Sequence, residues 1–391
     1  MIRTVVWAGL AVGAIVATVP ALADDDTVAI GLILPMTGPF ASTGKQEQAA
    51  ARLYVQQHGD TVAGKKITLL VRDDGGAPDV TKRLAQELIG NDKAKVLMGF
   101  GLTPLALAVA PVATEAKVPE IVTAAATAMI TEKSPYIART SFTLPQAAAP
   151  MAEWSLKNNI HKVVTLVTDY GPGNDAEKWF SEPFVKGGGV VVEKIRAPLK
   201  NPDFAPFLQR VKDDAPDAVF VFVPSGQGSA LMKQFAERGL DKAGIKLIGT
   251  GDVTDDDLLA EIGDAAVGVV TTHHYSASHP SPENQAFVEA FEKANNGMRP
   301  NFMAVGAYDG MALVYQALEK TKGATDGDAL IAAMKGASWM SPRGPVSIDP
   351  QTRDIIQNIY VRRVGKVDGE LYNIEFATID AVKDPFKAAG N

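Results

Sequence analysis

The feature that most constrains the fold is a regular alternation of apolar, β-rich runs with segments of helical periodicity. Runs such as Val28–Leu34 and Ala218–Val223 are apolar throughout and do not alternate with polar residues. Strands of this kind are typical of parallel sheets covered by helices on both faces, because both faces of each strand are then buried. The pattern therefore predicts an α/β fold.

The alternation occurs twice along the chain. A first array extends from Val28 to about Thr123, and a second begins with a helix at Pro145–Lys157 and a strand at Lys162–Thr168. The change of lobe is expected near Arg139–Pro145. Two lobes of this type predict a cleft between them, and ligands of open α/β sheets bind beyond the carboxyl ends of the strands.

The first 23 residues have the pattern of a secretory signal peptide. Arg3 supplies a positive start, an uncharged apolar run follows, and Ala21-Leu22-Ala23 forms an A-x-A cleavage site. We expect cleavage near Ala23 and export to the periplasm. No second apolar run is long enough to span a membrane, so the mature chain is expected to be soluble and not membrane-spanning.

Composition excludes several classes of protein. The chain has no cysteine, so disulfides, cysteine-ligated zinc and cysteine nucleophiles are absent. Its formal net charge of −7 argues against a nucleic-acid partner, which demands a basic surface. A protein exported without disulfides must gain its stability from large buried cores, and two α/β lobes can supply them.

Five loops at predicted strand ends share small residues, hydroxyl groups and accessible backbone amides. Such loops let a ligand approach the main chain, and the helix N-termini that follow favour an anion such as a carboxylate. We expect these loops to converge on the cleft. They are residues 99–104, 123–127, 169–173, 224–228 (which contains Ser225) and 250–252.

Two acidic residues, Asp169 and Asp252, lie in these loops. A carboxylate beside a binding site is suited to a ligand ammonium group. Asp252 is the better candidate because no basic residue is near it in sequence, although it could also cap a helix predicted at Asp255–Ile262. Asp169 is expected to bond the amides of its own turn.

Other patterns point to chemistry that we consider less favoured. Residues 171–176 match a dinucleotide fingerprint, but Asp175 and Glu177 would repel a pyrophosphate, so no cofactor is expected. His273 and His274 should point to opposite faces of a strand, which disfavours a shared metal and suggests histidines at the surface or cleft rim. No catalytic pairing of nucleophile and base stands out, so no enzyme activity is expected.

The chain resembles the periplasmic solute-binding proteins of branched-chain amino-acid ABC transporters, the leucine/isoleucine/valine-binding type. The matching segments keep the order of that family and cover nearly the whole mature chain. They are Ile30-Gly31, Pro35–Pro39 with Gly44, Arg72–Asp74, Gly99 with Leu107–Pro111, Val118-Pro119 with Thr123–Thr127, Arg139-Thr140, Asp169–Gly171 and Ala307–Asp309.

The resemblance implies two Rossmann-like lobes with parallel-rich sheets, joined by a three-crossover hinge that closes on the ligand. The ranges expected for the first lobe are 24–143 and 273–345, and those for the second lobe are 144–272 and 346–391. In the first lobe, the family pattern places ligand contacts at Thr103 with Leu102 beside it. It also places them at Ala125 and Thr127, which would hold an α-carboxylate.

In the second lobe, the family pattern places an aromatic contact at Tyr170 and the acid for an α-ammonium at Asp252. Phe40 and Tyr275 are weaker candidates for the wall around the ligand side chain. The sequence departs from the pattern where Thr103-Pro104 replaces a serine-rich run and where Ala124 replaces a proline. Asp252 is also shorter than the glutamate usual at its place, which leaves the side chain of the ligand open.

The expected function is capture of a small amino acid, of branched-chain or related type, and its delivery to an inner-membrane ABC permease. The alternatives are a binding protein for another carboxylate or amide, such as an aromatic acid or urea, and a ligand sensor of the same fold. A periplasmic hydrolase is a further rival, and it requires a coupled nucleophile and base in the cleft.

Overall fold

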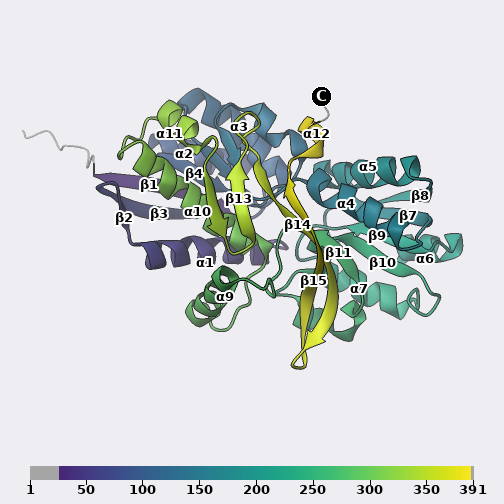
Figure 1. Cartoon of the computed structure of the whole chain (residues 1–391). Helices are drawn as coiled ribbons and strands as arrows, with labels where there is room; N and C mark the ends of the chain where they lie inside the picture. Colours follow the sequence, from purple (N-terminus) through teal and green to yellow (C-terminus); the bar gives the residue numbers. More distant parts are fainter. Residues whose placement is uncertain (1–25, 389–391) are drawn as a thin grey trace, which may run out of the picture.

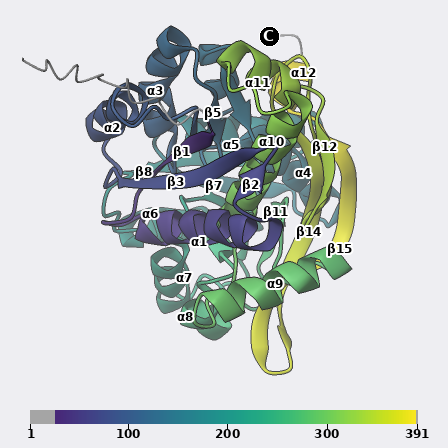
Figure 2. The same cartoon turned by 90° about the vertical axis from the view of Figure 1, so that its left-hand side faces the viewer.

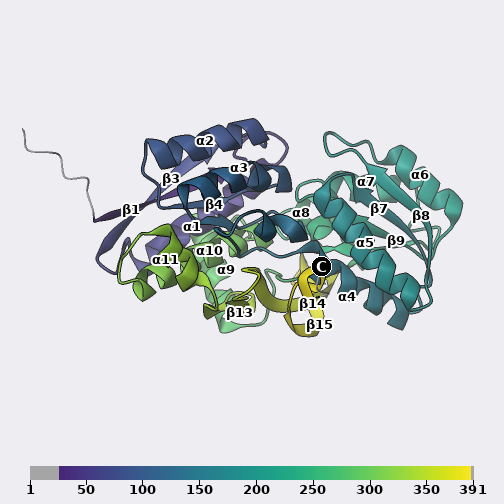
Figure 3. The ribbon, with the colours of Figure 1, turned by 90° about the horizontal axis from the view of Figure 1, so that it is seen from above.

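The computed structural model describes residues 26–388 and contains two lobes, each built around its own sheet (Figure 1). The segment predicted as a signal peptide lies outside the described residues. Seen from above, the two lobes lie side by side, and the C-terminal strands run between them (Figure 3). Two lobes with parallel-rich sheets agree with the predicted fold class.

The first lobe is built on a six-stranded sheet in the order β2-β3-β1-β4-β5-β6, parallel except for the β2–β3 pair. In β1, the consecutive residues Leu32, Ile33 and Leu34 are all buried, because helices cover both faces as the apolar pattern predicts. The strands are β1 (Thr27–Leu34), β2 (Thr61–Val62), β3 (Lys65–Asp73), β4 (Val96–Gly99), β5 (Glu120–Val122) and β6 (Ile137–Arg139).

Helices from two separate parts of the chain cover this sheet. α10 packs along α1, although about 250 residues separate them in sequence (Figure 2). Sequence reasoning missed α11, which packs on α10 and β6. The helices are α1 (Ala41–His58), α2 (Pro78–Gly90), α3 (Thr103–Ala116), the 3₁₀ helix η1 (Ala128–Lys133), α10 (Phe302–Lys320) and α11 (Gly327–Met334).

The second lobe is built on a nine-stranded mixed sheet. Its parallel part has the order β11-β10-β9-β7-β8, and β14 joins it to an antiparallel part that contains β12, β13 and β15. The strands are β7 (Lys162–Thr168), β8 (Val190–Ala197), β9 (Ala218–Phe222), β10 (Lys246–Thr250), β11 (Val270–His273), β12 (Ser338–Ser341), β13 (Gly344–Ile348), β14 (Ile355–Val367) and β15 (Glu370–Val382).

The remaining helices surround the second sheet, except α9, which packs on α1 and β12. They are α4 (Leu144–Lys157), α5 (Gly171–Lys186), α6 (Ala205–Asp214), α7 (Gly228–Glu237), the 3₁₀ helix η2 (Gly251–Thr254), α8 (Leu259–Ile262), the 3₁₀ helix η3 (Gly263–Ala266), α9 (Pro282–Ala294) and α12 (Pro385–Ala388).

Among the helix boundaries that differ from the sequence prediction, two have a clear physical reason. The sequence pattern predicts a helix over Ala176–Val185, but α5 begins at Gly171. Pro172 fits the first turn of a helix, because its missing N–H leaves no bond unmade there. The predicted helix over Asp255–Ile262 is reduced to Leu259–Ile262. The carboxylate of Asp255 accepts bonds from the Ser225–Gly226 loop, which holds this segment outside a regular helix.

The chain passes between the lobes three times: between β6 and α4, between β11 and α10, and along β14, where Ile355 packs in the first-lobe core and Val364 in the second-lobe core. One hydrophobic cluster extends across these passes, with Phe142 from the first and Phe302 from the second in edge contact at 5.8 Å between centroids. The hinge is therefore well packed, which restricts the relative motion of the lobes.

Candidate ligand-binding site

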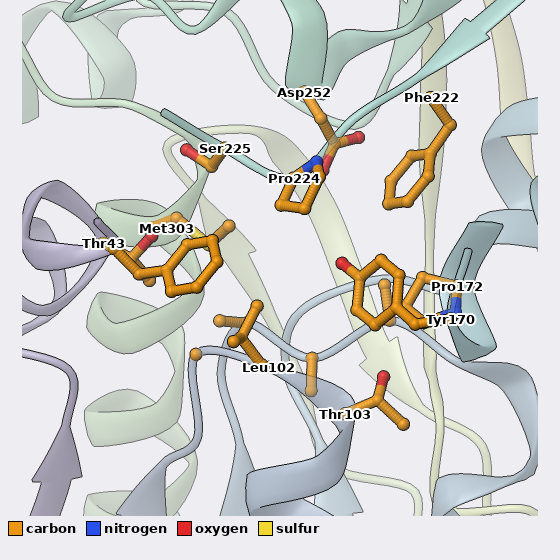
Figure 4. A pocket seen from close by; sticks show the side chains of 15 residues that line it. Thr43, Leu102, Thr103, Tyr170, Pro172, Phe222, Pro224, Ser225, Asp252 and Met303 are labelled. Atoms are coloured by element: carbon orange, nitrogen blue, oxygen red, sulfur yellow. The ribbon is translucent and has the colours of Figure 1, made fainter. Parts of the chain in front are cut away.

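A small hollow lies between the two lobes. It is bounded by α1, the loops after β4 and β5 and the start of α10 on one side, and by the loops after β7, β9 and β10 on the other (Figure 4). The lining residues are Phe40, Thr43, Gly101, Leu102, Thr103, Ala124, Ala125, Ala126, Tyr170, Pro172, Phe222, Pro224, Ser225, Asp252 and Met303.

The first lobe contributes a helix N-terminus with no side-chain cap. Leu102 is the N-cap of α3, makes no side-chain capping bond, and is followed by Thr103 at the first helical position. The first turn contains no acidic residue, so the unbonded amide and the helix dipole favour an anion there. The hydroxyl of Thr103 lies 2.7 Å from that of Thr127, which fixes its position.

The second lobe contributes a second uncapped helix N-terminus and two aromatic rings. Tyr170 is the N-cap of α5 without a side-chain capping bond, and Pro172 lies in the first turn of that helix. The rings of Tyr170 and Phe222 stack at 6.1 Å between centroids with 25° between their planes. In Figure 4 the Tyr170 hydroxyl points into the hollow. Together these groups form a flat apolar wall with one polar tip.

Asp252 supplies the carboxylate of the hollow, since no other acidic residue and no lysine or arginine lines it within residues 26–388. Burial raises the pKa of Asp252 to about 7. A hydrogen bond of 2.9 Å from the Thr250 hydroxyl favours the charged form and opposes this rise in part. Burial, and secondarily the neighbouring Asp252, raise the pKa of Tyr170 well above its usual value. Asp252 can therefore accept or donate a proton near neutral pH, while the phenol of Tyr170 stays neutral.

Arg362 of β14 is a basic residue near Asp252, which the sequence alone did not reveal. No base is near Asp252 in sequence, but Arg362 is close enough in space to lower the pKa of Asp252 in part. Its guanidinium donates to the Gly251 carbonyl at 3.3 Å, so it holds the backbone beside Asp252. Asp169 also differs from expectation: its exposed carboxylate lies 3.6 Å from Arg196.

Seven of the nine residues singled out from the sequence line this hollow, and they come from six loops and helix starts. The other two do not line it. Thr127 lies behind Thr103, and Tyr275 is fully buried in the core, with its carbonyl bonded by Arg362. The seven are Phe40, Leu102, Thr103, Ala125, Tyr170, Ser225 and Asp252.

The expectation of exposed histidines was wrong. His273 and His274 are both fully buried, with ring centroids 4.4 Å apart and both rings against Phe142 and Phe302. The alternation of strand side chains does not separate the rings because β11 ends at His273. Burial lowers the pKa of both imidazoles well below the usual value, so both are neutral at pH 7.

Sequence reasoning missed the largest apolar parts of the lining. Phe222 ends β9, two residues before the predicted loop 224–228, so inspection of that strand end could have found it. Met303 lies in the first turn of α10 and reaches the hollow only because of the second pass between lobes. No local signal in the sequence marks it.

A hollow between two α/β lobes, with facing helix N-termini and a hinge of three passes, defines a two-lobed solute-binding protein. The chain matches the periplasmic binding protein family over residues 27–369. It belongs to that family, and it is a substrate-binding protein of the class that serves ABC transporters. Within residues 26–388, no helix combines the length and the apolar character needed to cross a bilayer.

Three known proteins illustrate the similarity. The Leu/Ile/Val-binding protein homolog 6 of Brucella abortus is 45% identical over 92% of this chain and 93% of its own length. A solute-binding protein of an ABC transporter from Rhodopseudomonas palustris BisB5, solved in complex with 3,4-dihydroxybenzoic acid, is 66% identical, with a TM-score of 0.91 over 93% of this chain and 99% of that chain. A second solute-binding protein, from Rhodopseudomonas palustris HaA2 and solved in complex with p-hydroxybenzoic acid, is 45% identical. Its TM-score is 0.91, over 93% of this chain and 100% of that chain.

Proposed function

We propose that the protein captures a hydroxylated aromatic carboxylate in this hollow and delivers it to an inner-membrane ABC permease. The observation that carries the proposal is the shape of the lining: stacked Tyr170 and Phe222, with Phe40 and two prolines, enclose a space suited to a flat ring. The 66% and 45% identical proteins with bound hydroxybenzoates support the same class of ligand.

The polar groups of the hollow match the two ends of such a ligand. The ring carboxylate would accept bonds from the Thr103 hydroxyl and the uncapped amide at the start of α3, with α5 adding its own positive N-terminal end. In Figure 4, Asp252 lies on the opposite side of the hollow from Thr103, where it would meet a ring hydroxyl. No buried ligand charge is then left without a partner.

The remaining parts of the proposal follow from the family. Export would use the predicted signal peptide with cleavage near Ala23, so the mature chain would act in the periplasm. We propose no catalysis, because binding of the ligand between two helix N-termini supplies neither a nucleophile nor a paired base. The lobe boundaries proposed from the sequence, 24–143 with 273–345 and 144–272 with 346–391, stay part of this proposal.

A branched-chain amino acid is the second candidate ligand. Asp252 favours it, because a buried carboxylate in the hollow could take an α-ammonium while Thr103 holds the α-carboxylate. The 45% identical relative named Leu/Ile/Val-binding protein homolog 6 is consistent with this candidate. Both candidate ligands place their carboxylate at the N-terminus of α3. They differ in the group that faces Asp252, which is a ring hydroxyl in one and an α-ammonium in the other.

A ligand screen separates the two candidates. We expect 4-hydroxybenzoate and 3,4-dihydroxybenzoate to raise the melting temperature of the mature protein, with leucine giving no shift at the same concentration. A ligand at 100 times its Kd adds about 2.7 kcal/mol to the free energy of unfolding, which a thermal melt detects easily. Stabilisation by leucine and not by either aromatic acid would overturn the proposal.

The pH dependence of binding gives a second test through Asp252, whose pKa is about 7. An ammonium ligand binds only the ionised carboxylate, so its affinity should fall by up to about tenfold for each pH unit below 7. A ring hydroxyl can donate to the ionised form or accept from the protonated form. We therefore expect calorimetry to give nearly constant affinity for 4-hydroxybenzoate between pH 6 and 8, in wild type and in Asp252→Asn alike. A steep loss toward pH 6 in wild type alone would favour an ammonium ligand.

A further inference from the structure

Three consecutive acidic residues, Asp255, Asp256 and Asp257, lie between η2 and α8 on the second lobe, and each has a different set of partners. Asp255 accepts bonds from Ser225 and Gly226 at 2.6 and 2.9 Å, and Asp256 accepts a bond from Asn373 at 3.0 Å. Ser225, Gly226 and Asn373 belong to the second lobe, and Asp256 also accepts a bond of 3.3 Å from the Ala277 amide, just after β11. The first two carboxylates therefore hold loops of their own lobe and the start of the second pass between lobes in place.

Among residues 26–388, the side chain of Asp257 forms its hydrogen bonds with the first lobe. One of its carboxylate oxygens accepts a bond from the Ser42 hydroxyl at 2.7 Å, and the other accepts a bond from the Asn301 side-chain amide at 2.9 Å. Ser42 lies in the first turn of α1, and Asn301 is the N-cap of α10. Neither helix has an acidic residue in its first turn, so the negative charge of Asp257 is placed where two helix dipoles favour it.

The geometry of Asn301 makes this contact specific. Its side-chain oxygen accepts bonds from the amides of Met303 and Ala304, which fixes the orientation of the group and directs its NH₂ toward Asp257. Ser42 and Asn301 are next to or close to residues that line the hollow, namely Thr43 and Met303. Asp257, Ser42 and Asn301 do not themselves line it, so a ligand in the hollow has no direct contact with them.

We propose that Asp257 is a closure latch, a positioning residue that bonds α1 and α10 across the cleft only when the lobes are together. Both bonds break when the lobes separate, and the carboxylate then returns to water. The latch therefore sets how long the closed form lasts, and it acts equally on every ligand of the hollow. The inference rests on ligand binding in the hollow as proposed above, and it does not depend on the class of ligand.

Removal of the latch should act on ligand release. In Asp257→Ala, we expect the dissociation rates of 4-hydroxybenzoate and of 3,4-dihydroxybenzoate to rise by the same factor, about tenfold. Loss of the hydrogen bonds to one charged group that is partly open to water has an effect of this size. The association rates, the ratio of the two affinities and the ligand-free unfolding midpoint should stay unchanged. Ser42→Ala should give a smaller rise and should add little to Asp257→Ala, because both remove the same contact.

Asp264→Ala is the matched control. Asp264 lies on the same lobe, its side chain is 78% exposed, and its 2.7 Å pair with Lys366 stays within that lobe. We expect wild-type dissociation rates for this variant. A change in the ratio of the two affinities in Asp257→Ala would place Asp257 in contact with ligand, and an unchanged dissociation rate would show that its bonds do not hold the lobes together. Either result overturns the inference.

A second measurement keeps the latch testable when neither aromatic acid binds. Because the chain has no cysteine, Lys82→Cys on α2 and Lys233→Cys on α7 place one dye on each lobe. We expect the population with the lobes together to be smaller in Asp257→Ala than in wild type, without ligand and with leucine. Equal populations would overturn the latch, whereas wild-type protein that fails to bind either acid would overturn only the aromatic proposal.

Discussion

Gly171→Leu should abolish tight ligand binding without loss of stability in the ligand-free protein. Gly171 is the first residue of α5 on the second lobe, and a Cβ atom there would lie 2.8 Å from the Thr127 hydroxyl of the first lobe and 3.6 Å from Thr103. The hydroxyls of these threonines are bonded to each other, so neither can move freely. A leucine side chain needs still more room, and the lobes could then meet only with a clash.

The expected loss of affinity for 4-hydroxybenzoate is about 100-fold, because overpacking of a closed contact costs up to about 3 kcal/mol. When the lobes are apart the leucine faces solvent, so the urea midpoint without ligand should be that of wild type. Gly90→Leu is the control: Gly90 ends α2, and nothing lies within 4 Å of an added Cβ. Wild-type affinity in Gly171→Leu would show that the lobes do not need this contact to close.

The fold could be predicted from the sequence because most of the parallel strands are short, apolar and separately recognisable. β1, β7 and β9 lie within one residue of their predicted limits, since burial on both faces leaves no polar position to confuse the pattern. The predictions were less accurate where tertiary contacts decide the local structure. Residues 255–258 carry helix-compatible residues but lie outside a helix, because Asp255 is bonded to Ser225 and Gly226.

In the candidate site, too, the residues marked by local sequence could be predicted and those placed by tertiary contacts could not. The loops that contain Thr103, Tyr170 and Asp252 could be found because loops at the carboxyl ends of parallel strands converge on one edge. Asp252 was singled out from its charge, whereas Thr103 and Tyr170 were singled out by the family resemblance. Met303 could not be found, because its place depends on how α10 packs against α1 after the second pass between lobes. Tyr275 was misplaced for a related reason: its chain direction after β11 is set by the buried hinge, which the sequence does not specify locally.

Arg343→Met should destabilise the protein more than any substitution in the hollow. Arg343 lies on the turn between β12 and β13, is fully buried, and pairs with Asp309 of α10 at 2.6 Å. Its guanidinium also donates to the Ser141 carbonyl at 3.1 Å and to Gln357 at 2.8 Å, so a single side chain joins the first pass between lobes, α10 and β14.

Loss of this guanidinium leaves the Asp309 carboxylate buried, with Trp339 and Ser341 as its remaining partners in the described part of the chain. Removal of one member of a buried ion pair costs about 3 to 5 kcal/mol, because the remaining charge is neither paired nor solvated. We expect urea unfolding at pH 7 to show a loss of this size. Arg83→Met is the matched control, since the 2.6 Å pair of Arg83 with Glu87 lies on the exposed surface of α2 and should contribute less than about 1 kcal/mol. Equal effects of the two substitutions would mean that the three passes are held by apolar packing around Phe142 and Phe302, and that Arg343 adds no more than a surface ion pair.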